Sequence, residues 1–291
     1  MNIRLKDIEE LVFNGDAIPV NQDSLLRHNP IVNTQQTLSY IVETDEGKFF
    51  YKRYTKKPKL NGRGTLKKII FDNMVYSMPA TRYINYKASS LQETRKEAES
   101  SRIWDKLGIK SPKLIFYDGG YIVVFEFLRG HSMEEELNIP NLNEEAFSRT
   151  LDSLQGIRDV AKKYRNLQIL HSDPYANNFF YDEKSGLIMP IDSSKIIRDN
   201  MNFEEADCTM NLFFLYKIFH LKTKNENHLR YLEQAVDRYS KNERQEMFKA
   251  HFDPLIQRFY FTRIHKLPEI NNKDIYFRKD IRESIQESLS K

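Results

Sequence analysis

A short segment past the middle of the chain carries the side chains best suited to chemistry. Leu-His-Ser-Asp-Pro-Tyr-Ala-Asn-Asn occupies positions 170–178 and places Asp173 on a tight loop, with the carboxamide of Asn178 five residues further on. A second carboxylate, Asp192, follows the strand-like segment 187–191, which returns after a turn. A hairpin would therefore bring one general base and two candidate metal ligands together.

These side chains suit different parts of a phosphoryl transfer. Magnesium takes hard oxygen ligands, only a few of them from protein, and Asn178 and Asp192 offer such oxygens. Asp173 would then be free to orient and deprotonate an attacking hydroxyl. The alternative is structural, because any one of His171, Asp173 and Asn178 could instead cap a turn or a helix.

Strands are predicted upstream of this loop. Segments 38–44 and 48–54 are rich in β-branched and aromatic residues and flank a glycine-containing turn. Segments 113–117 and 121–128 flank a second such turn. Between the two hairpins, apolar residues of segment 91–107 recur at roughly helical spacing, and a glycine follows. The first 130 residues are therefore predicted to be mostly sheet with one inserted helix.

The rest of the chain has helical periodicity. Segments 144–163 and 206–221 show it, as do stretches of 227–264, while strand-like pieces occur only near 179–181 and 187–191. We expect a linker near 127–131, and hence a β-rich lobe at 1–128 and a helical lobe at 129–291.

With these elements around them, His171, Asp173, Asn178 and Asp192 resemble the catalytic residues of the protein-kinase-like superfamily. Its catalytic loop reads His-x-Asp, with Asn five residues after the Asp and a metal-binding Asp on the next strand turn. The resemblance implies an α+β, bilobal protein-kinase-like fold. A small, mostly antiparallel β N-lobe with one key helix would bind the nucleotide, and a larger helical C-lobe would carry the catalytic loop and the metal site.

The resemblance also implies a role for each matching residue. Lys52 would hold the α- and β-phosphates of ATP, paired with Glu97, for which Glu99 is the rival. Asp173 would be the catalytic base, and Mg²⁺ would be held by Asn178 and Asp192. The adenine would lie against backbone groups of the hinge. Further residues complete the implied site: Glu126, Phe127 and Leu128 as the hinge, His171 as a brace of the loop, and Asp207 as a buried anchor for the loop backbone.

Within the superfamily, the sequence is most similar to the bacterial lipopolysaccharide core kinases, which phosphorylate a heptose or a 3-deoxy-manno-octulosonic acid sugar. The shared features are a basic, glycine-containing insert at 62–70 after the lysine strand, the Thr81-Arg82-Tyr83 segment, and the helix bearing the glutamate. This resemblance implies transfer of the γ-phosphoryl of ATP to a hydroxyl of a glycan or glycolipid acceptor, most simply the lipopolysaccharide core.

The sequence departs from the kinase pattern in ways that keep two other hypotheses open. The expected phosphate-covering loop near 32–39 has no glycine, and Ser193-Ser194 follows Asp192 in place of Phe-Gly. Only fourteen residues separate Asp192 from Asp207, which is too few for a long phosphorylated activation loop. The alternatives are a small atypical protein kinase or ATPase acting on a protein partner, and a catalytically inactive pseudokinase interaction module.

Basic residues cluster after the first hairpin. Eight fall within positions 52–68, where no acidic residue occurs. This stretch is either a solvated loop or a surface attracted to a phosphorylated glycan and an anionic membrane face. It carries no motif that reads nucleic acid, so nucleic acid is not favoured as a partner. The six residues assigned to the membrane contact are Lys56, Lys57, Lys59, Arg63, Lys67 and Lys68.

Composition limits the remaining possibilities. The 291 residues are 40% hydrophobic and 30% charged, with a net charge of +4, as in an ordinary globular protein. A single cysteine, Cys208, excludes an intramolecular disulfide and a multi-cysteine metal site. Residues 1–16 contain no sustained apolar stretch, so we expect a cytoplasmic protein, with contact to the inner membrane face limited to its surface.

Overall fold

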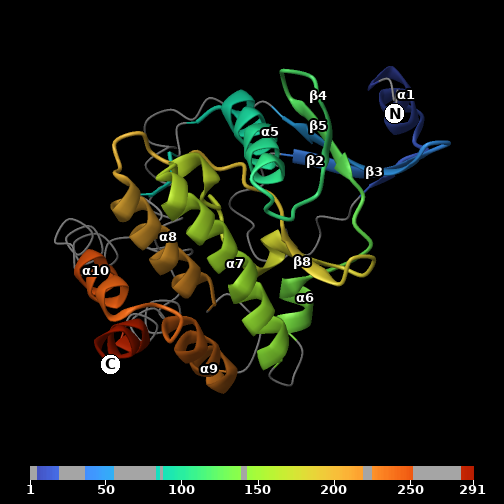
Figure 1. Ribbon diagram of the computed structural model, residues 1–291. Helices are drawn as coiled ribbons and strands as arrows, with labels where there is room; N and C mark the ends of the chain where they lie inside the picture. The colour runs from blue at the N-terminus through green and yellow to red at the C-terminus, as the bar shows by residue number, and fades with distance from the viewer. Residues whose placement is uncertain are drawn as a thin grey trace, which may run out of the picture.

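The computed structural model describes residues 5–19, 37–55, 83–85, 88–138, 143–218, 225–251 and 283–291. Within these ranges the chain forms a β-rich lobe followed by a mainly helical one, and Figure 1 shows them as the upper right and lower left parts of the molecule. The predicted α+β class, with an antiparallel sheet in the first lobe and helices in the second, is confirmed.

The first lobe is built on a five-stranded antiparallel sheet with the order β1-β2-β3-β5-β4. Both predicted hairpins form, because each pair of β-branched and aromatic segments is joined by a tight turn. Two helices accompany the sheet. The elements are α1 (Leu5–Asn14), β1 (Ile18–Pro19), β2 (Thr37–Thr44), β3 (Gly47–Tyr54), α5 (Ser90–Lys106), β4 (Leu114–Tyr117) and β5 (Ile122–Glu126).

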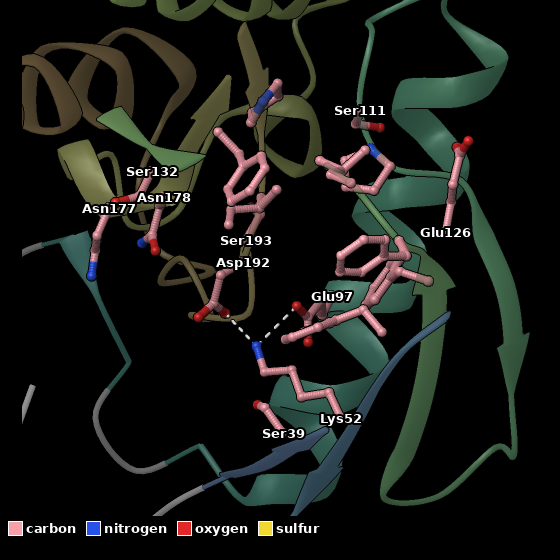
Figure 2. Close-up of a pocket in the computed structure, with 18 of the residues that line it drawn as sticks. Ser39, Lys52, Glu97, Ser111, Glu126, Ser132, Asn177, Asn178, Asp192 and Ser193 are labelled. Atoms are coloured by element: carbon pink, nitrogen blue, oxygen red, sulfur yellow. Dashed lines mark hydrogen bonds and ion pairs between the residues drawn. The ribbon is translucent and has the colours of Figure 1, made fainter. Parts of the chain in front are cut away.

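Side chains along β3 alternate between the two faces of the sheet. Phe49 packs with Ile8 of α1 on one face. Tyr54 packs with Ala98 of α5 on the other. Lys52 shares the second face with Tyr54, so its ammonium group is directed toward α5 (Figure 2).

Helix α1 was not predicted, since the sequence indicated a single helix in this lobe. Its Ile8 is fully buried against the sheet, while Lys6 and Glu10 form an exposed ion pair at 3.5 Å. Ile8, Leu11 and Val12 recur at helical spacing, so the sequence does carry a signal for this helix, but the run is only ten residues long.

Helix α5 confirms the predicted helix and has a mainly polar buried face. A capping box of Ser89 and Gln92 fixes its start. Its buried side chains include Glu93, Lys96 and Glu97. Buried charges of this kind need partners, so the neighbours of α5 must supply them.

The second lobe combines helices with a three-stranded sheet of order β6-β7-β8. Gly130 in β6 has φ +150°, and a Cβ there would lie 2.0 Å from the carbonyl oxygen of Tyr181 in β7, so only glycine fits where the chain enters this sheet. The elements are β6 (Gly130–Ser132), α6 (Met133–Leu137), α7 (Glu144–Tyr164), the 3₁₀ turns η1 (Leu167–Ile169) and η2 (Ala176–Asn178), β7 (Phe179–Asp182), β8 (Leu187–Pro190), α8 (Phe203–Ile218), α9 (Asn225–Val236) and α10 (Lys241–His251).

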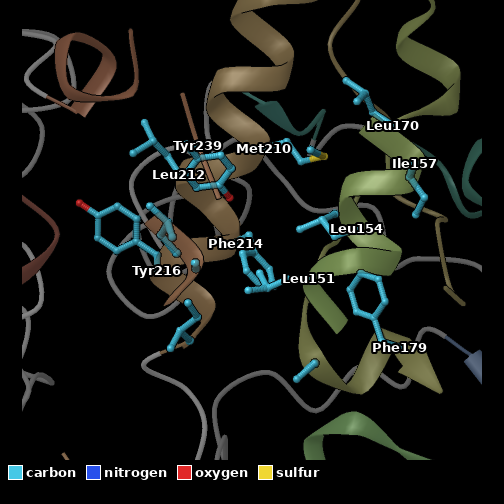
Figure 3. Close-up of a cluster of buried hydrophobic side chains, with 14 of the residues drawn as sticks. Leu151, Leu154, Ile157, Leu170, Phe179, Met210, Leu212, Phe214, Tyr216 and Tyr239 are labelled. Atoms are coloured by element: carbon cyan, nitrogen blue, oxygen red, sulfur yellow. The ribbon is translucent and has the colours of Figure 1, made fainter. Parts of the chain in front are cut away.

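Helices α7 and α8 form the centre of this lobe's core. Leu151 and Leu154 of α7 point toward α8 (Figure 3), and Ile157 of the same helix is buried in the same core. Residues 211–218 of α8 are all buried, so this helix is surrounded by protein on every side. The core fixes the position of the loop between α7 and β7, which contains the predicted catalytic residues.

Candidate active site

A cavity of about 740 Å³ lies where the two lobes meet, and it contains most of the predicted site residues. Its walls come from β2, β3, α5, the segment after β5, η2 and the end of β8 (Figure 2). The predicted residues that line this cavity are Lys52, Glu97, Glu126, Phe127, Leu128, Asn178 and Asp192. The lining is thus assembled from segments far apart in the sequence.

Lys52 is held between two carboxylates inside this cavity. Its Nζ lies 3.0 Å from Glu97 Oε1 and 2.9 Å from Asp192 Oδ1 (Figure 2). The rival Glu99 instead pairs with Arg95 on the exposed side of α5, at 2.7 Å. Burial lowers the pKa of the Lys52 ammonium, but Asp192 and Glu97 raise it more, so the net pKa lies above its usual value. Lys52 is therefore a fixed positive charge.

Tyr54 is a site residue that the sequence did not reveal. It stands two positions after Lys52 on β3, and its hydroxyl donates a hydrogen bond to Glu97 Oε2. Burial, and then the Glu97 charge, raises the pKa of Tyr54 well above its usual value, so the group stays a donor. With Lys52 on one oxygen and Tyr54 on the other, the Glu97 carboxylate is fixed in orientation. The alternation of side-chain direction along β3, which puts Tyr54 on the same face as Lys52, was the one sequence signal for this contact.

Asp192 has an unusual backbone conformation. Its φ is +54°, in the left-handed region, which few residues other than glycine adopt. Partial burial acts to raise the pKa of Asp192, but the Lys52 ammonium and a hydrogen bond from Ser194 lower it to about 2. Asp192 is thus a carboxylate at neutral pH and is turned toward Lys52.

The predicted catalytic loop is braced by its own hydrogen bonds and by the strand that follows. The Asn178 side-chain amide donates to the Asp173 carbonyl at 2.9 Å, and the Ile191 amide donates to the Asn178 carbonyl at 2.8 Å. The Ser172 amide donates to the Ser193 hydroxyl at 3.2 Å. Ser193, one of the two serines that replace Phe-Gly, therefore ties the loop to the segment after Asp192.

His171 is completely buried beneath the loop. Its Nδ1 accepts the Asp173 amide at 3.1 Å, so its Nε2 carries the hydrogen and donates to the Ile191 carbonyl at 3.0 Å. Its ring lies 5.6 Å from that of Trp104 and 5.3 Å from that of Phe179. Desolvation lowers the pKa of His171 to about 4.

This buried histidine predicts a loss of stability in mild acid. Below pH 6.5 the unfolded state takes up a proton that folded His171 resists, so the free energy of unfolding should fall as the pH drops toward 4, by roughly 3 kcal/mol in all. Urea unfolding at several pH values should show this fall in the native protein. His171→Phe keeps a ring in place and removes the titration; an equal pH dependence in both proteins would contradict the prediction.

Helix α5 is attached directly to the segment that precedes the catalytic loop. Lys96 Nζ donates to the Gln168 carbonyl at 2.9 Å, and Trp104 Nε1 donates to the Ile169 carbonyl at 2.8 Å. Burial lowers the pKa of Lys96 to about 7. The sequence did not identify these contacts, which join residues 65 and 72 positions apart. These two hydrogen bonds fix the position of the helix that carries Glu97 relative to the loop that carries Asp173.

Asp207 is buried on α8, and both of its carboxylate oxygens face Arg158 of α7. Arg158 Nε lies 2.9 Å from Oδ1 and Nη2 lies 3.0 Å from Oδ2. The contacts described for Asp207 thus join α7 to α8, and its predicted bond to the loop backbone stays a prediction.

Several predicted features fall outside the described ranges. The six basic residues between 56 and 68 are among them, as is the Thr81-Arg82 pair and most of the glycine-free loop at 32–39. From the described end of that loop, Thr37 and Ser39 of β2 line the cavity.

Comparisons with known proteins give similarity at the level of fold. No family model matches the chain, and no curated protein matches its sequence. The kinase domain of Mycobacterium tuberculosis PknI, in a doubly substituted form, aligns with 75% of this chain and 92% of its own at 9% identity and a TM-score of 0.41. The Rio2 kinase–ADP/Mg²⁺–phosphoaspartate complex from Chaetomium thermophilum aligns with 97% of this chain and 74% of its own at 12% identity and a TM-score of 0.40.

The order of the elements, with the Lys52–Glu97 pair between β3 and α5 and Asp192 after the β7–β8 hairpin, makes this a protein-kinase-like fold. In the part of the chain that the structure describes, no group of three or more His, Cys, Asp or Glu side chains gathers as a metal cluster. No helix in the described ranges has the length and apolar character needed to cross a bilayer.

Proposed function

We propose that the protein is an ATP-dependent phosphotransferase that acts on a hydroxyl group. The observation that carries this proposal is the Lys52 ammonium, fixed between Glu97 and Asp192 in a cavity beside the braced Asp173 loop. Phosphoryl transfer demands mainly positioning and charge neutralisation, which such an arrangement supplies. Lys52 would align the phosphates, and Asp173 would orient the acceptor hydroxyl and accept its proton.

The cavity has places for the nucleotide base and for a divalent cation. Glu126, Phe127 and Leu128 line the cavity, and their backbone groups would bind the adenine. A carboxylate from Asp192 and a carboxamide from Asn178 are hard oxygen ligands, and Mg²⁺ needs only a few of these from protein. These two residues fit a magnesium ion, which would neutralise phosphate charge when bound.

We further propose that the acceptor is a sugar-containing molecule, with lipopolysaccharide core sugars as the first to test. The segment after Asp192 is short and held in place: the Asn85 amide donates to the Ile196 carbonyl at 2.7 Å, and the Arg198 amide to the Tyr83 carbonyl at 3.1 Å. Protein kinases that are switched by phosphorylation order a mobile activation loop at this place. A short, fixed segment supports a constitutive enzyme with a small-molecule or glycan acceptor.

Magnesium-dependent nucleotide binding tests the core of the proposal. The melting temperature of the native protein should rise by several degrees with ATP and Mg²⁺ together, because a ligand at roughly 100 times its Kd stabilises the folded state by about 2.7 kcal/mol. Asp192→Asn should abolish this shift, whereas Asp199→Asn, the same change at an exposed position seven residues on, should retain it. The absence of any shift in the native protein would overturn the proposal and favour an interaction module.

The acceptor is tested separately by following phosphate from labelled ATP. We expect incorporation into lipopolysaccharide core saccharides and none into a protein mixture. Labelled protein, with no response to saccharide, would support the alternative of a protein-directed kinase and would remove the glycan proposal while leaving phosphotransfer intact.

A further inference from the structure

A lysine that belongs to no recognised motif stands beside Asp173. Lys217 lies on α8, within the run 211–218 that is buried on all sides, and is itself 8% exposed. Its Nζ lies 3.9 Å from Asp173 Oδ1. Burying an ammonium group is unfavourable unless it has a partner of opposite charge or a π-system, so its place at the site is specific.

Two aromatic rings help to hold this ammonium group. Lys217 Nζ lies 4.9 Å from the ring centroid of Tyr175 and 4.8 Å from that of Phe213, which are cation–π distances. Tyr175 belongs to the catalytic loop and Phe213 to α8. The Lys217 side chain is thus fixed between helix and loop, with its charge at the Asp173 carboxylate.

The catalytic loop supplies no positive charge of its own. Positions 170–178 contain neither Lys nor Arg. The histidine of this loop, His171, is neutral because burial lowers its pKa to about 4. Lys195 also feels the Asp173 charge, but its ion-pair contact is with Glu93 of α5, at 3.6 Å, and its side chain is 32% exposed. In the part of the chain that the structure describes, Lys217 is the buried lysine whose ion-pair contact is with Asp173.

The separation of Lys217 and Asp173 leaves room for a substrate oxygen. At 3.9 Å the two atoms are too far apart for a direct hydrogen bond, so the pair does not close the carboxylate off. An oxygen atom at hydrogen-bond distance, about 2.8 Å, can contact both groups at once. Oxygens of a transferring phosphoryl group carry the charge that such a cation would neutralise.

We propose that Lys217 is a catalytic residue of the phosphoryl transfer and contacts an oxygen of the transferring group beside Asp173; this inference rests on the proposed function. As the acceptor oxygen bonds to the γ-phosphorus, the bond from that phosphorus to the bridging oxygen breaks, and its electron pair leaves with ADP. The acceptor proton passes to the Asp173 carboxylate. Lys217 keeps its protons throughout and offsets the charge of the phosphoryl oxygens.

The kinetics of three variants test this assignment. The assay is ATP hydrolysis, with water as the acceptor, followed by the release of ADP. Lys217→Met keeps most of the length of the side chain between the two rings and removes the charge. It should lower kcat by about 10²–10³-fold and change the KM for ATP only slightly. Lys217→Arg should recover part of the loss. Lys249→Met, the same change at an exposed, ion-paired lysine on α10, should leave kcat unchanged.

Chemical rescue separates a catalytic charge from a structural brace. Adding a small alkylamine to Lys217→Ala should restore turnover in proportion to amine concentration, because the amine can occupy the space between the rings. If native protein turns over ATP and Lys217→Met does so equally, this inference alone is wrong. If Lys217→Met fails to fold and neither Lys217→Arg nor amine rescue gives activity, Lys217 is a structural residue. Absence of both nucleotide binding and turnover in native protein overturns the proposed function and this inference with it.

Discussion

Asp173→Asn is expected to lower ATP turnover by about 10²–10⁴-fold, because an amide cannot accept the proton of the attacking hydroxyl or water. The substitution preserves the size of the side chain and leaves the backbone carbonyl that Asn178 contacts. Nucleotide binding should persist, since Lys52, Asn178 and Asp192, the residues proposed to hold the phosphates and Mg²⁺, are unchanged. ADP release measures the turnover, and the magnesium-dependent rise in melting temperature measures the binding.

Asp199→Asn provides the matched control for this prediction, as an exposed aspartate whose loss should leave turnover at the native value. Native-like turnover by Asp173→Asn would remove Asp173 as the base. A loss of the ATP shift together with turnover would mean that the loop supports the nucleotide site and would leave the base unassigned.

Arg158→Ala is expected to destabilise the protein by about 3–5 kcal/mol, because it leaves the buried Asp207 carboxylate without its partner. Arg158 is 1% exposed, pairs with both oxygens of Asp207 and also contacts Glu243 at 2.8 Å. The guanidinium also lies 5.1 Å from the ring centroid of Tyr239, so packing is lost along with charge. Urea unfolding gives the free energy directly.

An exposed ion pair that also involves α7, the helix of Arg158, serves as the comparison. Arg238 contacts Asp152 of α7 with both side chains well exposed, so Arg238→Ala should cost at most about 1 kcal/mol. A loss of similar size in the two variants would show that burial does not set the strength of the Arg158 network. Replacing Arg158 and Asp207 together by leucine should cost less than Arg158→Ala, since no unpaired charge then remains buried.

The connection of α5 to the second lobe bears on how the site is regulated. Lys96 and Trp104 bond to the carbonyls just before the catalytic loop, and residues 83–85 hold the segment after Asp192. Kinases that are switched often displace the helix that carries the glutamate or the segment after the metal-binding aspartate. Both parts are anchored here, which agrees with a site that is assembled without a switch.

The sequence by itself determined the class and order of most elements and the loop with His171, Asp173 and Asn178. Strands and helices have short periods, and turns have typical residues, so neighbouring positions are enough to predict them. The hairpins of the first lobe, the long helix α7 and the β7–β8 hairpin were all indicated in this way. Helix α1 was missed although Ile8, Leu11 and Val12 recur at helical spacing, because ten residues give only a short run of that period.

Only the tertiary structure decided which side chains meet. Glu97 and Glu99 stand two positions apart on the same helix, and the rotation of α5 about its axis turns the first toward Lys52, 45 positions away, and the second toward solvent. The contacts of Tyr54 with Glu97 and of Lys217 with Asp173 likewise depend on how separate elements pack. The physical reason is that local propensity fixes the backbone of each element, whereas the direction of its side chains relative to distant neighbours is fixed by burial in a shared core.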